Sequence, residues 1–307
     1  MTSADLSDSD VDELRAFLLS TCDNVSRWLP PPQWAPTWQS EAERECRNTE
    51  QGQAGPWGEN PVRTVYTGGA LYLDTILDCL RCLAGTLTPE TTHYVVETVA
   101  RAAMEAGAVL FWLLQPGIGA RLRVARFWLV RASGSEYLDE AVQKIDPWAA
   151  PGTYGETPVM VKAAVQSLGL NYTRRQNRRT GRWSWTIEGE KLPSYTVRAV
   201  AFEAAVSMRA AYAIYSAPAH AEWHAVVGRF REVTLPGGQR MLSQRPDREA
   251  VAAAVLASSG FAIKPTEPAL RLLGRTARVA EIGYHARRAD YLIHRLGLAA
   301  DWSRWRP

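Results

Sequence analysis

Two histidines are spaced so that they could hold a metal ion or move a proton. His220 and His224 lie four residues apart, so on a helix both rings share one face. The metalloprotease pattern needs a glutamate directly after the first histidine, whereas Glu222 comes two residues later and lies on another face. Cys79 and Cys82 have redox or zinc spacing, but their flanks read as one continuous helix and no second close pair follows. We therefore expect no bound metal and no cofactor.

Two glutamates lie within apolar helical stretches, where a carboxylate needs a partner. Burying an unpaired carboxylate is costly, so each must find a cation or bind its proton more tightly. Arg101 stands one turn before Glu105 and is its simplest partner. Glu203 could pair with Arg126 or Arg209 from another helix. These carboxylates are either structural ion-pair partners or pocket residues that take part in chemistry.

Ser216 and His220 belong to a second apolar helical stretch that contributes polar groups. Because polar groups buried between helices must satisfy one another, we expect both side chains to line an internal cluster with Glu105 and Arg101. In an enzyme, Glu105 or His220 would move protons in such a cluster. The alternative is that these groups only satisfy each other and hold the helices together.

Arg287 and His294 form an alternative catalytic pair. They are seven residues apart on a predicted helix and lie on one face. This satisfies the spacing of arginine and histidine that HEPN-type ribonucleases use: the arginine neutralises the scissile phosphate and the histidine moves the 2′-hydroxyl proton. Arginine is so frequent in this chain that such a spacing also arises by chance.

One segment combines a crowd of arginines with two tryptophans. Cations beside stacking platforms are what proteins use to bind single-stranded nucleic acid. The alternative is a solvated arm that packs its tryptophans onto the body while its arginines face water. The candidate nucleic-acid-binding residues are Arg174, Arg175, Arg178, Arg179, Arg182, Trp183 and Trp185.

Composition describes an ordinary folded protein. The chain has 307 residues, 46% of them hydrophobic and 22% charged, which excludes a disordered chain. A net charge of +3 is too small to demand a polyanionic partner. The N-terminus lacks the basic and apolar regions of a signal peptide, and the most apolar stretch, residues 102–114, is too short to span a bilayer. We expect a cytoplasmic protein that does not bind membranes.

Helical periodicity and cap residues dominate the chain. The expected helices cover residues 8–29, 40–47, 62–86, 89–115, 117–145, 158–170, 195–215, 220–228, 247–260 and 266–297. Residues 171–193 and 230–242 alternate like small β-hairpins, and residues 30–61 are rich in proline and tryptophan that should pin them to the body. The pattern predicts an all-α fold: one helical bundle domain, residues 1–307, with two small β inserts.

The central region resembles a known group of proteins. An arginine and a glutamate share one helix, an arginine-rich helix follows at 121–131, and Pro193-Ser194 opens a later helix. That helix ends in the series Tyr212, Ser216, His220 and Trp223. This layout, which covers residues 90–230, resembles helical bacterial proteins, common in actinobacteria, that are described as HEPN-like or abortive-infection-like. The resemblance implies a helical bundle with a polar pocket.

The chain departs from the ribonuclease pattern at one point. No arginine stands four to six residues before His220, because Arg209 is eleven residues away. If His220 is the histidine of that group, ribonuclease chemistry is not expected there. The candidate catalytic residues of the pocket are Arg101, Glu105, Glu203, Tyr212, Ser216 and His220.

Three functions remain open from the sequence. The first is an RNA-directed protein of a defence or toxin system, with RNA held by the arginine-rich segment. The second is an enzyme of specialised metabolism that takes a small hydrophobic substrate into an apolar, tryptophan-rich pocket. The third is a helical binding or scaffold protein without catalysis. In each case the chain could also pair with a second copy of itself.

Overall fold

A computed structural model gives the arrangement of the elements. It describes residues 7–29, 36–51, 61–89, 91, 93–146, 148–150, 152–179, 181, 183–206, 211–220, 230–244 and 248–296. The helices are α1 (Asp8–Trp28), α2 (Glu41–Gln51), α3 (Pro61–Thr86), α4 (His93–Leu113), α5 (Gly119–Ile145), α6 (Pro158–Ser167), α7 (Tyr195–Val206), α8 (Ala211–Ala219), α10 (Arg248–Leu272) and α11 (Val279–Arg295), with a 3-10 turn, η1 (Thr276–Arg278). The strands are β1 (Tyr172–Gln176), β2 (Trp183–Ile187), β3 (Glu190–Lys191), β4 (Phe230–Thr234) and β5 (Arg240–Gln244).

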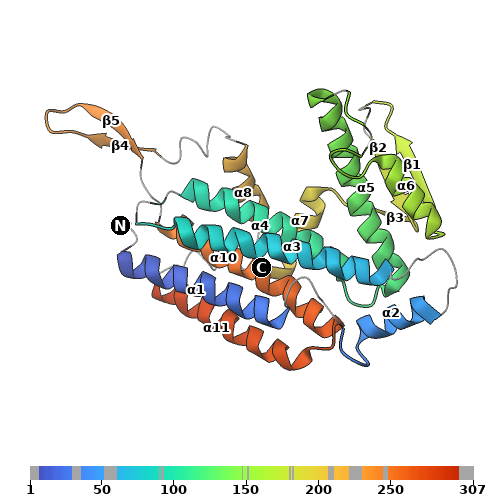
Figure 1. The fold of residues 1–307 in the computed structure, drawn as a ribbon. Coiled ribbons are helices and arrows are strands. Elements are labelled where there is room, and N and C mark those ends of the chain that lie inside the picture. Colours follow the sequence, from blue (N-terminus) through green and yellow to red (C-terminus); the bar gives the residue numbers. More distant parts are fainter. Residues whose placement is uncertain are drawn as a thin grey trace.

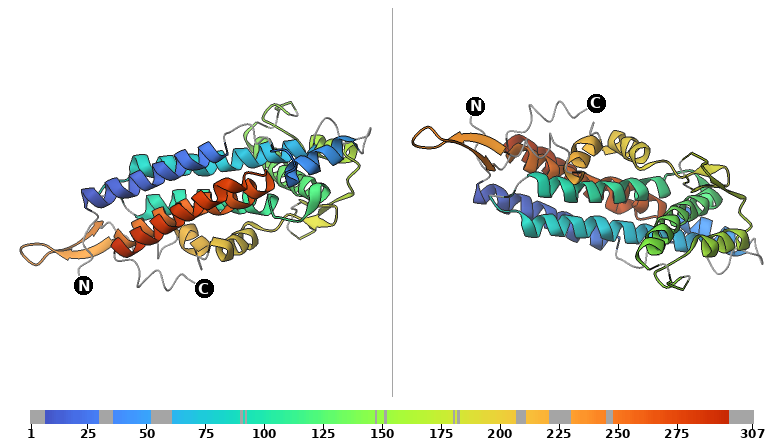
Figure 2. Two further views of the ribbon diagram at one scale, coloured as in Figure 1. Left: turned by 90° about the horizontal axis from the view of Figure 1, so that it is seen from below. Right: turned by 90° about the horizontal axis from the view of Figure 1, so that it is seen from above.

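The fold is all-α with small β inserts, as the sequence predicts. α1, α3, α4, α10 and α11 lie side by side along the long axis of the molecule, and α7 and α8 cover α4 (Figures 1 and 2). At one end α5 packs on α3 and carries α6 and the three-stranded sheet β1-β2-β3. At the other end the β4–β5 hairpin extends beyond the bundle (Figure 1). None of the described helices is long and apolar enough to cross a membrane.

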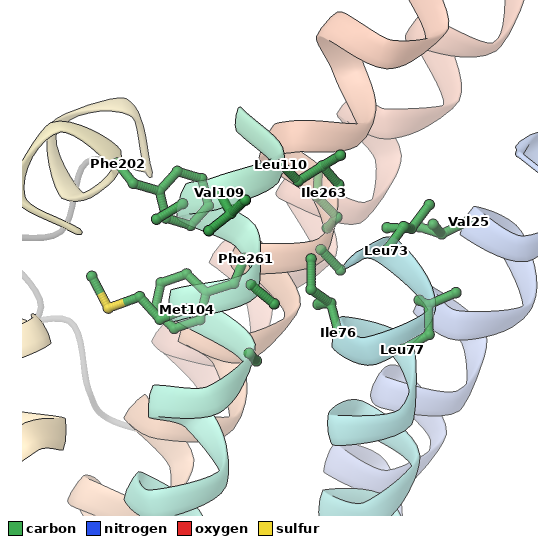
Figure 3. Close-up of a cluster of buried hydrophobic side chains, with 14 of the residues drawn as sticks. Val25, Leu73, Ile76, Leu77, Met104, Val109, Leu110, Phe202, Phe261 and Ile263 are labelled. Carbon is green, nitrogen blue, oxygen red and sulfur yellow. The ribbon is translucent and has the colours of Figure 1, made fainter. Parts of the chain in front are cut away.

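The core lies where five helices of the bundle meet. Figure 3 shows side chains from α1, α3, α4, α7 and α10 directed at one another, because apolar residues recur on one face of each helix. Phe202 of α7 and Phe261 of α10 stack with their ring centroids 5.8 Å apart, and both are fully buried. Each such side chain stabilises the fold by about 1.5–3 kcal/mol.

α10 is longer than the sequence predicts. It runs unbroken through residues 260–266, where we expected a gap, and contains Pro265 and Pro268. A proline inside a helix leaves the carbonyl four residues earlier without its usual donor. For Pro265 that carbonyl belongs to Phe261, and Gly107 of α4 packs closely against it. Packing against α4 therefore outweighs the tendency of the prolines to end the helix.

The break between the last two helices comes at Gly274 instead. Gly274 has φ +75°, and the next amide, from Arg275, donates to the Leu270 carbonyl (2.7 Å) to close the helix end. A side chain at Gly274 would collide with Thr37, so glycine fits here for two reasons. α11 consequently begins at Val279 rather than at residue 266.

Other predicted segments are described only in part. The predicted helix 195–215 corresponds to α7 and α8, and residues 207–210 between them lie outside the described residues. The predicted helix 220–228 lies outside them from residue 221 onward.

In the proline- and tryptophan-rich segment, Trp38 is 73% exposed with Arg47 over its ring (4.3 Å), so this tryptophan does not pin the chain to the body. Residues 30–35 and 52–60 lie outside the described residues.

The arginines of α5 turn inward as well as outward. Arg123 is fully buried and donates to both carboxylate oxygens of Glu45 (3.1 and 3.3 Å) and to the Leu113 carbonyl (3.1 Å). The Tyr66 hydroxyl donates to the same carboxylate (2.7 Å). This network joins α2, α3, α4 and α5, and it holds the end of the bundle that carries the sheet.

His285 of α11 lies buried against α1 in a network that suits a neutral ring. Asn24 donates from Nδ2 to its Nε2 (2.8 Å), and Arg27 donates to the Asn24 side-chain oxygen (3.0 Å), which fixes the orientation of the amide. The other ring nitrogen lies 3.4 Å from the Thr21 hydroxyl, which itself donates to the Phe17 carbonyl. We infer that the ring carries its proton on Nδ1.

We expect the protein to lose stability as the pH falls below about 6.5. Burial lowers the pKa of His285 from its ordinary value of 6.5; the Arg288 charge also lowers it and Glu281 opposes the shift. In acid the unfolded chain therefore binds a proton here that the folded protein does not, which favours unfolding. Urea unfolding at about pH 7.5 and about pH 5.5 measures the loss. A His285→Gln variant should lose less between these two pH values, and equal losses in both proteins would contradict the assignment.

Candidate nucleic-acid interface

β1, β2 and the turn between them, residues 172–187, form a hairpin that we call the arm. Its strands pair antiparallel with Arg174 opposite Trp185 and Gln176 opposite Trp183. The turn closes at Gly181, whose φ of +68° suits glycine and whose amide donates to the Asn177 carbonyl (2.8 Å). The predicted insert is therefore an ordered β-hairpin, and β3 adds a third strand to it.

The inner face of the arm is anchored on α5. Trp185 is buried, and its indole N–H donates to Glu136 (2.9 Å). Arg174 donates twice to the same carboxylate (2.6 and 3.0 Å), and its guanidinium lies 3.9 Å from the Trp183 ring centroid. Two of the predicted nucleic-acid-binding residues, Arg174 and Trp185, thus hold the arm in place.

The acidic residues that follow the arm are neutralised by α5. Glu188 pairs with Arg121 (2.9 Å), and Glu190 pairs with Arg126 (3.1 Å). The hydrogen bond from Arg121 holds the pKa of Glu188 below its usual range. These carboxylates face α5, so they do not compensate the arginines on the outer side of the arm.

The outer side and the tip of the arm carry free cations. Arg175, Arg178 and Arg179 are exposed, and within the described part of the chain their side chains form no ion pair or hydrogen bond. Trp183 is 43% exposed, and Arg174 lies against one of its faces. Arg182 lies outside the described residues. Three of the predicted arginines are thus exposed on the arm, while Trp183 is partly exposed on the sheet face that carries Arg174 and Trp185, opposite to the face of Arg175.

A cavity of about 280 Å³ opens between the arm, α5 and the start of α7. Trp183 and Trp185 line it from the arm, and Tyr195, 58% exposed, lines it from α7. Two further cations, Lys191 and Arg198, also line it. We did not single out Lys191, Tyr195 or Arg198 from the sequence. The only local signal was Ser194, whose side chain accepts the Val197 amide and caps the start of α7.

A second cavity, of about 220 Å³, lies beside the end of α5 and has the opposite charge. Its charged lining residues are Asp139, Asp146 and Glu156. Among the described residues, no three histidine, cysteine, aspartate or glutamate side chains gather as metal ligands.

Four of the predicted pocket residues come together between α4, α7 and α8. Arg101 donates to Glu105 (2.8 Å), one turn further along α4, and its guanidinium lies over the Tyr212 ring (5.6 Å). Glu203 is buried in the last turn of α7 and accepts the backbone N–H of Tyr212 (2.5 Å), in the first turn of α8. Arg126, which we considered as a partner of Glu203, binds Glu190 instead.

Tyr215 and Glu97 extend this cluster further along α4 and α8. Tyr215 is fully buried, and burial together with the nearby Glu97 and Glu203 carboxylates raises its pKa. Glu97 is buried too, two turns before Glu105. Glu97, Arg101 and Glu105 follow one face of α4 at intervals of four residues, a series that the sequence contains but of which we did not single out Glu97.

His220 and Ser216 lie at the other end of α8. His220 is exposed, two helical turns beyond Tyr212, and its backbone N–H donates to the Ser216 carbonyl (3.1 Å). Within the described residues neither side chain has a recorded bond to Glu105 or Arg101. His224 lies outside the described residues.

Arg287 and His294 are both exposed on the outer face of α11. The neighbouring Tyr284 and Tyr291 are more than half exposed on the same helix. α11 lies against α1, on the far side of the bundle from the arm (Figure 1). The alternative catalytic pair is thus accessible but separate from the arm and its cavity.

Comparison of the chain with known protein families, with curated proteins and with solved structures gives no match.

Proposed function

We propose that the protein binds single-stranded RNA on the surface formed by the arm and the start of α7. The observation that carries this proposal is that the arm carries three exposed, unpaired arginines, Arg175, Arg178 and Arg179, among the described residues. Two partly exposed rings, Trp183 and Tyr195, line one cavity where the arm meets α7. Unpaired cations attract phosphates, and exposed rings stack on bases that are not already paired. A strand can follow the arginines while one or two of its bases rest on the rings.

We propose RNA rather than another polyanion as the ligand for two reasons. Stacking on Trp183 and Tyr195 requires bases, which acidic peptides and sulfated sugars lack. Single-stranded RNA and single-stranded DNA both offer bases and phosphates to such a surface. We choose RNA because residues 90–230 resemble HEPN-like proteins. The protein would then belong to the RNA-directed class.

The small-molecule enzyme has less support from the same geometry. Glu105 is already paired with Arg101, and His220 lies exposed two turns beyond Tyr212. A proton-transfer pair needs both groups within reach of one reacting atom. The arm, by contrast, offers an open surface with charge and rings together.

The test compares RNA binding by the wild type and by an Arg175→Ala/Arg178→Ala/Arg179→Ala variant. The ligands are a labelled single strand of about ten nucleotides as RNA, the same sequence as DNA, and an RNA duplex. We expect the variant to bind the single-stranded RNA about tenfold more weakly or worse, because each arginine lost removes a phosphate contact. The duplex should bind wild type more weakly than the single strand does.

A control variant removes three exposed cations from the bundle, Arg81→Ala/Lys264→Ala/Arg271→Ala. It has the same net charge as the arm variant, so any difference between the two reports position rather than total charge. Equal affinities in wild type and the arm variant, or no binding by either, would contradict the proposal. Recovered RNA should be examined for cleavage, with His294→Ala as the variant that removes the exposed histidine of α11.

A further inference from the structure

The cavity at the start of α7 is lined by a buried cation, Arg198, that no carboxylate among the described residues binds directly. Arg198 is only 6% exposed, yet within the described residues it forms no ion pair. Arg198 donates from Nη1 to the Pro193 carbonyl (3.0 Å), its guanidinium lies 4.7 Å from the Tyr195 ring centroid, and it also bonds the Tyr195 side chain. The Glu105 carboxylate offsets part of its charge without forming a direct ion pair. Burial lowers the pKa of this guanidinium. A buried charge is costly unless it is paired, so the side of Arg198 that lines the cavity favours an anion.

The first turn of α7 adds donors at the same place. Ser194 caps the helix by accepting the Val197 amide (3.3 Å), so the amides of Tyr195 and Thr196 are left without a partner in the helix. The twelve-residue helix also directs the positive end of its dipole toward this point. Amides and dipole together favour a phosphate or a carboxylate.

Charge in the rest of the cavity has the same sign. Lys191 lines it and is exposed, with no ion pair within the described residues. The acidic residue of the lining, Glu136, is already bound by Arg174 and by the Trp185 indole. The cavity is therefore lined by two cations and by no free carboxylate among the described residues: Lys191 is unpaired, and the charge of Arg198 is only partly offset by Glu105.

Aromatic rings form the remaining walls. Trp183, Trp185 and Tyr195 line the cavity and give it flat apolar surfaces next to the cations. Its volume of about 280 Å³ is near the lower end of ligand pockets, which suits one nucleotide. A nucleotide combines a flat ring with a strong anion at this scale.

We propose that this cavity binds the 5′-phosphorylated terminal nucleotide of the RNA strand, with the phosphate between Arg198, Lys191 and the start of α7 and the base against Trp183 or Tyr195. The inference rests on the proposed function, since the rest of the strand would follow the arginines of the arm. It adds that the protein distinguishes a 5′-phosphate end from a 5′-hydroxyl end.

The test uses three single-stranded RNAs of one sequence, about ten nucleotides long, that carry a 5′-phosphate, a 5′-hydroxyl or a 3′-phosphate. We expect the wild type to bind the 5′-phosphate RNA about tenfold more tightly than the other two, because a phosphate monoester gains charge-assisted hydrogen bonds in the cavity. Lys191 is exposed, so the Lys191→Ala variant should fold normally. It should lose most of the preference for the 5′-phosphate RNA and still bind the 5′-hydroxyl RNA as the wild type does. Arg198→Lys, which keeps the charge, should retain more of it than Arg198→Gln, with folding of both checked by thermal melting.

Uridine 5′-monophosphate alone, measured by calorimetry, separates this inference from the proposed function. RNA binding without any preference for the 5′-phosphate would overturn the inference and leave the function standing. If no RNA binds but uridine monophosphate binds the wild type and not Lys191→Ala, the nucleotide site stands and the RNA function fails. If neither ligand binds, both are wrong.

Discussion

Replacing Arg123 with methionine is expected to lower the free energy of unfolding by about 3–5 kcal/mol, because it leaves a buried carboxylate without its cation. Arg123 is fully buried and donates to both oxygens of Glu45, which also accepts from the Tyr66 hydroxyl. Methionine fills much of the space but supplies no donor to Glu45 or to the Leu113 carbonyl. Urea or thermal unfolding measures the loss directly.

A matched control is Arg121→Met on the same helix. Arg121 also pairs with a glutamate, Glu188, but its side chain is 46% exposed. Exposed ion pairs contribute about 1 kcal/mol or less, so this variant should lose little stability. A double variant, Arg123→Met with Glu45→Leu, removes the stranded charge and should recover part of the loss. Similar losses for Arg121→Met and Arg123→Met would contradict the structural role that we give to burial.

Truncating the two exposed rings is the second change with a large expected effect. Trp183→Ala and Tyr195→Ala should each weaken binding of single-stranded RNA by about 1–3 kcal/mol, roughly 5- to 150-fold in Kd, if each ring stacks on one base. Both residues are partly solvent-exposed, so the free energy of unfolding should change little. Fluorescence anisotropy with a short labelled RNA measures the binding, and thermal melting checks the fold.

Trp38 and Tyr291 provide controls that match these rings. Trp38 is also exposed with an arginine over its ring, and Tyr291 is 58% exposed, the same as Tyr195. Neither belongs to the arm, so Trp38→Ala and Tyr291→Ala should bind RNA like the wild type. A comparable loss in these variants would mean that stacking is not confined to the surface we describe.

Local signals in the sequence predicted most helices and both hairpins, because each depends on caps and periodicity. Ser7 begins α1 with the expected cap, and its side chain accepts the Asp10 amide (3.2 Å). The length of α10 could not be predicted from local signals, because its two prolines favour the start of a new helix. Only the packing against Gly107 and the helix end at Gly274 show that one helix continues through them. Local signals fail where a tertiary contact decides the boundary.

The candidate site was predictable in type but not in arrangement. The cluster of arginines and the two tryptophans are visible in the sequence. Which of them anchor the arm on α5 and which are exposed is not. Alternation along β2 predicts that Trp183 and Trp185 share a face, yet only the fold shows that Trp185 is covered by α5 while Trp183 reaches the surface. Lys191 and Arg198 are ordinary cations until the end of the arm and the start of α7 place them in one cavity.

The salt dependence of RNA binding tests the central claim most directly. For single strands, the logarithm of the binding constant falls with the logarithm of salt concentration by about 0.7 for each phosphate neutralised. The slope is measured between about 50 mM and about 200 mM salt. It should be shallower than that of the wild type by about 2 in the arm variant, Arg175→Ala/Arg178→Ala/Arg179→Ala. The control variant, Arg81→Ala/Lys264→Ala/Arg271→Ala, should keep the wild-type slope. Identical slopes in the wild type and the arm variant would contradict the assignment of the arm as the RNA-binding surface.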